Sequence, residues 1–208
     1  VVVPAVAAPR KPLQPLTTNA IRALAIASST GGPQALMTVF SGLKGKPLHI
    51  PVFITQHMPA LFTTVLAEHI ATASGFPCRE AKDGDIAEAG HIYVAPGDYH
   101  MVIRREGKNA VIHINKDPQV NFCRPAADPM FQSLSETYGK HLLAVVLTGM
   151  GRDGADGAQA ITNNGGVVVA QDEKTSIVYG MPKVVAERGV CQAILPLPDI
   201  AGFLLKNC

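Results

Sequence analysis

Three short hydrophobic segments of this chain are almost free of polar residues, and each leads into a turn that carries polar side chains. They cover residues 21–27, 51–56 and 142–148, and a fourth covers 166–170. Apolar segments of this length, bounded by glycine and proline, are typical of strands buried on both faces of a parallel sheet. Ligands bind outside the carboxyl ends of such strands. We therefore expect the side chains that follow these segments to meet at one edge of the sheet.

Helical patterns alternate with the predicted strands. Pro33, Pro59 and Pro182 each stand where the first turn of a helix is expected, a position that proline favours. Residues 78–114 differ, because their alternating segments and turn residues predict short strands and a hairpin. The alternation of strands and helices predicts an α/β fold. The clearest helical patterns cover residues 60–73, 128–138 and 153–163.

Composition and charge exclude several functional classes. The net charge of +2 is too small to indicate electrostatic binding to nucleic acid or to an anionic membrane. No apolar run approaches the roughly 20 residues that a bilayer-spanning helix needs. The cysteines are far apart and form no Cys-x-x-Cys pair, which favours free thiols over disulfides or a zinc site. We therefore expect a cytoplasmic protein without a bound metal; its cysteines are Cys78, Cys123, Cys191 and Cys208.

The first nineteen residues differ in composition from the rest. They contain Pro4, Pro9, Pro12 and Pro15, a density that favours an extended, semi-rigid linker. The chain also lacks an initiator methionine. We expect residues 1–19 to be an interdomain linker that follows an absent upstream domain, and residues 20–208 to be the functional domain. A disordered natural terminus left by processing is the alternative.

Ser29 is the first candidate for chemistry. It follows the first predicted strand and precedes a helix that begins near Gly31 and Gly32. Unpaired N–H groups at a helix N-terminus stabilise a developing oxyanion, and glycine lets a substrate carbonyl come close to the backbone. The simpler alternative is that Ser28, Ser29 and Thr30 only cap the helix.

His57 is the candidate base for Ser29. A serine hydroxyl needs a base to remove its proton, and imidazole titrates in the right range. The chain has seven histidines, but His57 stands between a buried strand and a predicted helix. The main rival is His100, which has Asp98 two residues before it.

Gly149, Gly151 and Gly154 follow a predicted strand, and Asp172 lies about 20 residues further on. This spacing formally matches a dinucleotide-binding fingerprint, so a Rossmann-like dinucleotide-binding domain is an alternative function. The carboxylate of Asp153 argues against it, since a fixed negative charge at the start of the following helix would repel a pyrophosphate.

An acid at Asp153 suits a different task, which is to accept a hydrogen bond and orient an imidazole. Two alternatives stay open at this point. Asp153 could be a plain helix cap, and Asp156, one turn later, is a competing acid.

Taken together, these loops resemble the catalytic domain of the chemotaxis protein-glutamate methylesterase family, CheB. The resemblance covers roughly residues 21–205 in order. It implies a doubly wound, mainly parallel sheet with helices on both faces and an antiparallel hairpin, with no metal or organic cofactor. The matching motifs are Ser29-Thr30-Gly31-Gly32, Thr55-Gln56-His57-Met58-Pro59, Tyr93-Val94-Ala95-Pro96-Gly97-Asp98, His100-Met101, Arg124-Pro125, Leu147-Thr148-Gly149-Met150-Gly151, Asp153-Gly154 and Tyr179-Gly180-Met181-Pro182.

The resemblance also assigns a reaction. It implies a serine hydrolase that removes methyl esters from specific glutamates of chemoreceptors and deamidates specific receptor glutamines, in sensory adaptation. Ser29 is the implied nucleophile, His57 the base and Asp153 the orienting acid. The implied partners are the cytoplasmic helical domain of methyl-accepting chemoreceptors and an upstream phosphoacceptor receiver domain in the full-length protein. Binding of nucleic acid and insertion into a membrane are not expected.

Further site residues follow from the same loops. The N–H of Thr30, with Gly31 beside it, and the N–H of Met150 are expected to hold the oxyanion and the substrate. Arg124 is a candidate for contact with an acidic receptor surface, and a salt bridge with Asp128 or another neighbour is the alternative. For Cys123 beside it we expect a buried filler.

One departure from the family pattern affects the choice of nucleophile. The family commonly has Gly-Ala before the nucleophilic serine, where this chain has Ala27-Ser28. Ser28 is therefore a second candidate hydroxyl. A domain that only docks on receptors, without catalysis, is a further alternative.

Overall fold

One parallel sheet organises the computed structural model, which describes residues 20–208. The linker predicted for residues 1–19 lies outside the described residues. A separate antiparallel hairpin is formed by β5 (His100–Glu106) and β6 (Asn109–Asn115). The strands of the main sheet are β1 (Ala23–Ser28), β2 (Val52–Gln56), β3 (Cys78–Glu80), β4 (Ile92–Val94), β7 (Leu142–Val146), β8 (Val167–Gln171) and β9 (Ala193–Leu195).

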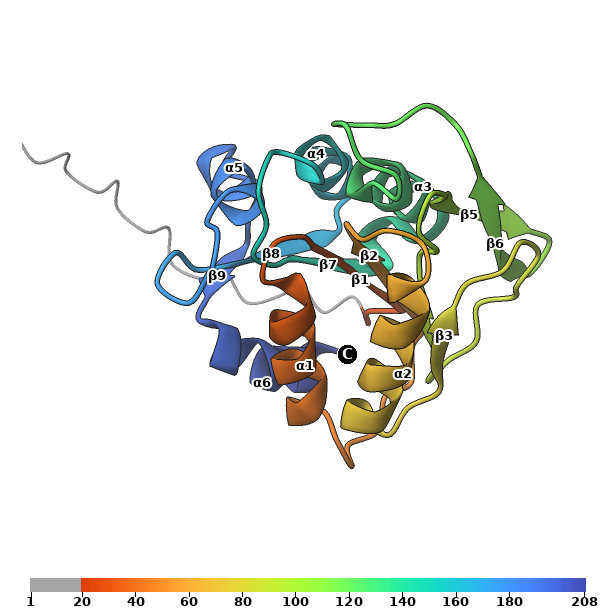
Figure 1. Cartoon of the computed structure of the whole chain (residues 1–208), viewed down its shortest axis with the longest axis horizontal. Helices are drawn as coiled ribbons and strands as arrows, with labels where there is room; N and C mark the ends of the chain where they lie inside the picture. Colours follow the sequence, from red (N-terminus) through yellow and green to blue (C-terminus); the bar gives the residue numbers. More distant parts are fainter. Residues whose placement is uncertain (1–19) are drawn as a thin grey trace, which may run out of the picture.

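Helices cover both faces of this sheet (Figure 1). One face carries α1 (Gly32–Gly42), α2 (Phe62–Ser74) and α6 (Leu197–Asn207). The other carries α3 (Ala127–Tyr138), α4 (Ala155–Asn163) and α5 (Met181–Glu187), and the hairpin packs beside α3. A short 3₁₀ turn, Gly139–His141, leads from α3 into β7. The predicted doubly wound α/β fold with an antiparallel hairpin is confirmed.

The two cores share β1, whose side chains alternate between the faces as the period of a strand requires. Leu24 and Ile26 pack with α1, α2 and α6, whereas Ala23, Ala25 and Ala27 pack with α3 and α4. All of these residues are fully buried. Full burial stabilises by about 1.5–3 kcal/mol for each large aliphatic side chain, so the sheet centre is a strong anchor for the loops at its edge.

The strand order places the reversal of winding next to β1. The order is β3-β4-β2-β1-β7-β8-β9, so the chain winds outward from β1 toward β3 and then restarts at β7. β1 pairs with β2 in the register Ser28 opposite Gln56, and with β7 in the register Ala27 opposite Val146. A crevice forms at such a reversal, at the carboxyl ends of the strands. The loops after β1, β2 and β7 therefore border one site.

The helix starts are predicted correctly at two of the three prolines. Pro33 and Pro182 occupy the first turns of α1 and α5. The prediction for Pro59 is wrong, because α2 begins only at Phe62, after Leu61 adopts a left-handed φ of 73°. The intervening loop packs against the backbone of Gly97, where a Cβ atom would overlap Pro59 and Ala60. That contact holds the segment after β2 as a loop. Within residues 20–208, every helix is too short or too polar to cross a bilayer.

Candidate active site

The three candidate catalytic residues lie in loops that leave neighbouring strands at the same edge of the sheet. Ser29 follows β1 directly, His57 follows β2 directly, and Asp153 lies in the loop between β7 and α4. The order of the strands is β2-β1-β7, so the serine loop stands between the other two. The topology thus brings these loops to one edge, although His57 follows Ser29 by 28 residues and Asp153 follows His57 by 96.

His57 and Asp153 form the central hydrogen bond of the site. Nε2 of His57 lies 2.6 Å from Oδ2 of Asp153, and the carboxylate is nearly inaccessible to solvent. Burial on its own would lower the pKa of His57, but the hydrogen bonds from Asp153 and Cys123 outweigh it and raise that pKa to about 9. Because Asp153 accepts at Nε2–H, Nδ1 is the nitrogen that a neutral His57 presents to a substrate or nucleophile.

Asp153 is fixed by more than the histidine. Its Oδ2 also accepts the N–H of Ala127, and its Oδ1 accepts the N–H of Asp128 at 3.1 Å. Burial would raise the pKa of Asp153, but the hydrogen bonds from His57 and Ala127 hold it below its usual range. The carboxylate therefore caps α3. It does not accept from the N-terminus of α4, the helix that follows it in sequence and whose N-cap residue is Gly154.

The N-terminus of α4 is capped by Asp128 from the first turn of α3. Asp128 Oδ1 accepts the N–H of Gly157 at 2.7 Å. The amide of Asn121 joins the two acids, since its Nδ2 donates to Asp128 at 2.9 Å and to Asp153 at 3.2 Å. Burial raises the pKa of Asp128 to about 6, and the nearby charge of Asp153 adds to the shift. The two helices thus exchange caps, which places Asp153 firmly beside the histidine loop.

The serine and histidine loops are joined by the buried side chain of Gln56. Its amide nitrogen donates to the carbonyls of Ser29 at 2.9 Å and His57 at 3.0 Å. Its Oε1 accepts the hydroxyl of Ser28 at 2.7 Å. The Ser28 hydroxyl is completely buried and engaged in this bond, so it does not suit the role of nucleophile. Ser29 is partly exposed, and no hydrogen bond joins its hydroxyl to His57 or to any other described residue.

Backbone donors surround Ser29. Gly31 is the cap of α1 with φ of 79°, and the N–H of Gly32 returns to the carbonyl of Ser29 at 2.8 Å. Within residues 20–208, the N–H groups of Thr30 and Met150 make no backbone hydrogen bond. Both residues are exposed. These groups are available to hold an oxyanion, as the sequence predicts, and that role stays a prediction.

Thr148 holds the serine loop against the glycine loop. Its hydroxyl donates to the carbonyl of Thr30 at 2.9 Å and accepts the N–H of Val178 at 2.9 Å. The carbonyl of Thr148 accepts the N–H of Ser29 at 3.0 Å. The neighbouring Gly149 has no room for a side chain, because a Cβ atom would lie 2.5 Å from Met181 and 2.7 Å from Ser29. The first glycine of the loop is therefore required by packing against Ser29.

His100, the rival base, is buried and uses both ring nitrogens within the protein. Nδ1 accepts the N–H of Ala126 at 3.3 Å, and Nε2 donates to the carbonyl of Pro118 at 3.1 Å. It therefore holds the hairpin to the start of α3. This leaves His57 as the histidine with an acid on one nitrogen, and its other nitrogen lies 3.4 Å from the sulfur of Cys123.

Arg124 uses its guanidinium within the protein. It donates from Nη2 to Asp98 at 2.8 Å, and from Nη1 to the carbonyls of Lys116 and Asp117 at 3.1 Å each. This is the salt bridge with a neighbour that the sequence left open, with Asp98 as partner in place of Asp128. The peptide bond between Arg124 and Pro125 is cis. A role of Arg124 in receptor binding stays a prediction.

For three residues of the site, the sequence predicted no part in its chemistry. Gln56 was identifiable in principle, since a polar side chain that closes a buried strand needs hydrogen bonds. Asn121 and Cys123 gave no such signal, because their contacts with Asp153 and His57 span 32 and 66 residues. Cys123 is partly exposed and its sulfur lies 3.4 Å from Nδ1 of His57, so the prediction of a buried filler is wrong.

Comparisons with known proteins agree with this geometry. The sequence model described as CheB methylesterase matches residues 24–204. The chain belongs to the CheB methylesterase family. It is 54% identical over 183 residues to the protein-glutamate methylesterase/protein-glutamine glutaminase 1 of Paramagnetospirillum magneticum, covering 88% of this chain and 48% of that protein. It is 53% identical over 196 residues to a protein of the same name from Rhodospirillum rubrum, covering 94% of this chain and 51% of that one.

A solved structure of the CheB family has the same fold. The CheB methylesterase catalytic domain of Thermotoga maritima superimposes with a TM-score of 0.86 at 36% identity, covering 90% of this chain and 98% of that one. The chain spans about half the length of the curated relatives it matches.

Neither the family nor the structure favours the dinucleotide-binding alternative. The carboxylate of Asp128, from α3, accepts the N–H of Gly157 in the first turn of α4, where a pyrophosphate would need free donors. The negative charge that would repel a pyrophosphate at this helix therefore belongs to Asp128, whereas the sequence predicted it for Asp153. The space beside Gly149, which the fingerprint would leave open for a pyrophosphate, is occupied by Ser29.

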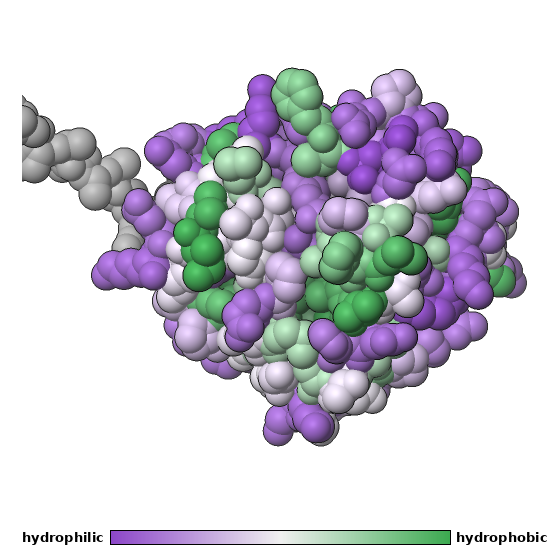
Figure 2. Space-filling model, in the orientation of Figure 1, coloured by the Kyte–Doolittle hydropathy of each residue, from purple (hydrophilic) through white to green (hydrophobic). Residues whose placement is uncertain are grey.

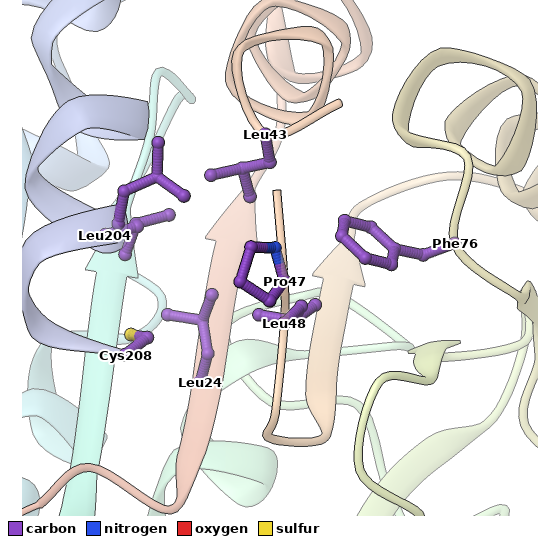
Figure 3. A pocket seen from close by; sticks show the side chains of 8 residues that line it. Leu24, Leu43, Pro47, Leu48, Phe76, Leu204 and Cys208 are labelled. Carbon is purple, nitrogen blue, oxygen red and sulfur yellow. The ribbon is translucent and has the colours of Figure 1, made fainter. Parts of the chain in front are cut away.

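An apolar pocket lies at the opposite end of the sheet from the site (Figure 3). It is bordered by Leu24 near the start of β1, by the α1–β2 loop and by α6. Its lining contains no charged side chain, so it offers no group for the proposed chemistry. The residues that line it are Leu24, Leu43, Pro47, Leu48, Phe76, Leu204, Leu205 and Cys208.

Proposed function

We propose that this domain is a serine hydrolase that removes methyl esters from specific glutamates of chemoreceptors and deamidates specific receptor glutamines. The observation that carries the proposal is the 2.6 Å hydrogen bond from His57 to Asp153 beside the loop that bears Ser29. The names of the Paramagnetospirillum and Rhodospirillum relatives support the two reactions. Both are acyl transfers from a glutamyl carbonyl, with methanol or ammonia as the leaving group.

In the proposed mechanism, the Ser29 hydroxyl attacks the ester carbonyl while Nδ1 of His57 takes its proton. Asp153 keeps the other proton on Nε2 and stabilises the imidazolium that forms. The N–H groups of Thr30 and Met150 hold the oxyanion of the tetrahedral intermediate. Methanol leaves with the proton from His57, and a water molecule, activated by the same nitrogen, then releases the glutamate and restores Ser29.

The surroundings of the site suit a protein substrate. Exposed apolar side chains come from four segments around the site. These are the segment between His57 and the first residue of α2, the loop of Cys123, the loop of Gly149, and the loop whose Ile177 packs against Gly31. Figure 2 shows apolar surface over the beginning of α2, divided by hydrophilic areas. Such a surface suits one face of an amphipathic helix of the receptor's cytoplasmic domain. The exposed residues are Leu61, Phe62, Phe122, Met150 and Ile177.

The wider organisation of the protein also belongs to this proposal. An upstream receiver domain, a linker over residues 1–19 and a cytoplasmic location are what the family resemblance implies. Relatives about twice as long as the matched region support a further domain in the full-length protein.

The test is release of methanol from a methylated receptor fragment, followed by mass spectrometry of the fragment. Wild-type protein is expected to release methanol and to convert each affected methyl ester to glutamate, whereas Ser29→Ala releases none and keeps its fold. Ser28→Ala is the matched control, and it is expected to keep most of the activity because its hydroxyl faces Gln56. Methanol release by Ser29→Ala at the wild-type rate would overturn the proposal.

A further inference from the structure

A second nucleophile contacts the imidazole of the site. Sγ of Cys123 lies 3.4 Å from Nδ1 of His57, and Nε2 of the same ring lies 2.6 Å from Asp153. Thiol, imidazole and carboxylate therefore stand in series. This is the arrangement in which an imidazole takes the proton of a thiol and leaves the reactive thiolate.

The other cysteines of the chain provide an internal reference. Burial raises the pKa of Cys78, Cys191 and Cys208 to about 12 in each case. None of these three has a hydrogen bond to a histidine among the described residues. Since the thiolate is the form that reacts, these three thiols are expected to be inert at neutral pH.

The loop around Cys123 is accessible. Cys123 is partly exposed, and its neighbour Phe122 is 95% exposed. Backbone hydrogen bonds of 2.9 and 3.1 Å between Val120 and Cys123 hold the thiol in place. A small reagent can therefore reach the sulfur while the sulfur stays beside His57.

A group attached to this sulfur would occupy the space next to Nδ1. Asp153 already holds Nε2, so Nδ1, which the thiol of Cys123 contacts, is the ring nitrogen that the proposed mechanism needs for the proton of Ser29. An adduct on Cys123 would therefore obstruct the base without any change elsewhere in the site.

We propose that Cys123 is a modification site for small electrophiles and peroxides, and that an adduct on its sulfur switches the hydrolase off by blocking His57. With iodoacetamide, the sulfur lone pair forms a bond to the methylene carbon, iodide leaves, and the thiol proton passes through His57 to solvent. With hydrogen peroxide, sulfur attacks one oxygen and the O–O bond breaks. The hydroxide that leaves becomes water with the thiol proton, and the cysteine is oxidised by two electrons to a sulfenic acid that thiols reduce.

The first test maps the site of labelling. The chain is treated with limiting iodoacetamide near neutral pH, and each cysteine peptide is quantified over time by mass spectrometry. Cys123 is expected to react at least about tenfold faster than Cys78, Cys191 or Cys208. Because exposure alone also speeds labelling, the decisive comparison is His57→Gln, in which the rate at Cys123 should fall about tenfold. An unchanged rate at Cys123 in that variant would refute its activation by His57.

The second test links labelling to activity and rests on the proposed function. Residual methanol release is plotted against the labelled fraction of Cys123, for wild type and for Cys123→Ala, each relative to its own untreated sample. Wild type should lose activity in proportion to labelling, and Cys123→Ala should lose none. Full activity in protein whose Cys123 is fully labelled would overturn the switch. If untreated wild type releases no methanol, the proposed function fails, whereas the mapping result still decides whether Cys123 is the reactive thiol.

Discussion

Replacing Asp153 with asparagine removes one charge at almost constant volume, in a position where every partner is a donor. Oδ2 accepts from His57 and Ala127, and Oδ1 accepts from Asp128 and Asn121. An asparagine has one accepting oxygen and one donating NH₂ group. Whichever way the amide is turned, its NH₂ group faces two of these donors.

The structure sets the size of the effect. A buried donor left without its acceptor costs about 1–3 kcal/mol, so the loss of one or two such pairings lowers the free energy of unfolding by about 1–6 kcal/mol. If the NH₂ group turns toward His57, it donates to Nε2 and forces the ring proton onto Nδ1. The nitrogen that should accept the proton of Ser29 is then blocked, and a wrong tautomer of this kind costs about 10⁴-fold in kcat.

The assay combines methanol release with urea unfolding. Asp153→Asn is measured at a temperature where circular dichroism shows it folded, beside the control Asp156→Asn. Asp156 is half exposed and pairs with Arg152 and Arg188 on the surface, so its loss should cost only about 0–1 kcal/mol and leave activity near wild type. Activity of Asp153→Asn within tenfold of wild type would refute the orienting role. Equal stabilities of the two variants would refute the capping of α3.

Three further predictions follow from the same network. Because the reaction needs neutral His57 and its pKa is raised to about 9, kcat/KM should climb as pH rises from neutral toward 9; a plateau already at pH 6 to 7 would contradict this assignment. Burial raises the pKa of Asp128 to about 6 from 3.8, so its contribution to stability is lost as pH rises from 4 through 6. In urea unfolding, Asp128→Asn should therefore lose less stability than wild type between these pH values, and an equal loss would argue against the shift. Gly149→Ala places a methyl group 2.7 Å from Ser29 and should lower both activity and melting temperature. Gly202→Ala has open space in α6 and should be neutral or slightly stabilising, so similar melting temperatures for these two variants would contradict the packing argument.

The sheet could be predicted from sequence because its strands are buried on both faces. A strand such as β7 consists only of apolar residues, so its burial can be predicted from its own sequence without knowledge of the residues that pack against it. The strand ends then located Ser29 and His57 through a general rule of parallel sheets. Pro59 shows the limit of local reasoning. A proline can precede a helix by several residues, and here the contact with Gly97 decides where α2 begins.

The hydrogen bonds of the site were less accessible to sequence reasoning. Asp153 stands just before α4, so local reasoning assigned its charge to that helix. The acceptor in fact caps α3, which lies 26 residues earlier, and Asp128 caps α4 in exchange. Such an exchange depends on how two helices pack, and no local pattern encodes it. The same holds for Cys123, whose contact with His57 exists only in the folded chain.

The most direct test of the account is the site of attack by a fluorophosphonate, which reacts with a serine activated by a neighbouring base. After labelling and digestion, mass spectrometry should find the adduct on Ser29, and His57→Gln should lack it. An adduct on Ser28 with none on Ser29, or equal labelling of Ser29 without His57, would contradict the claim that His57 and Asp153 activate Ser29.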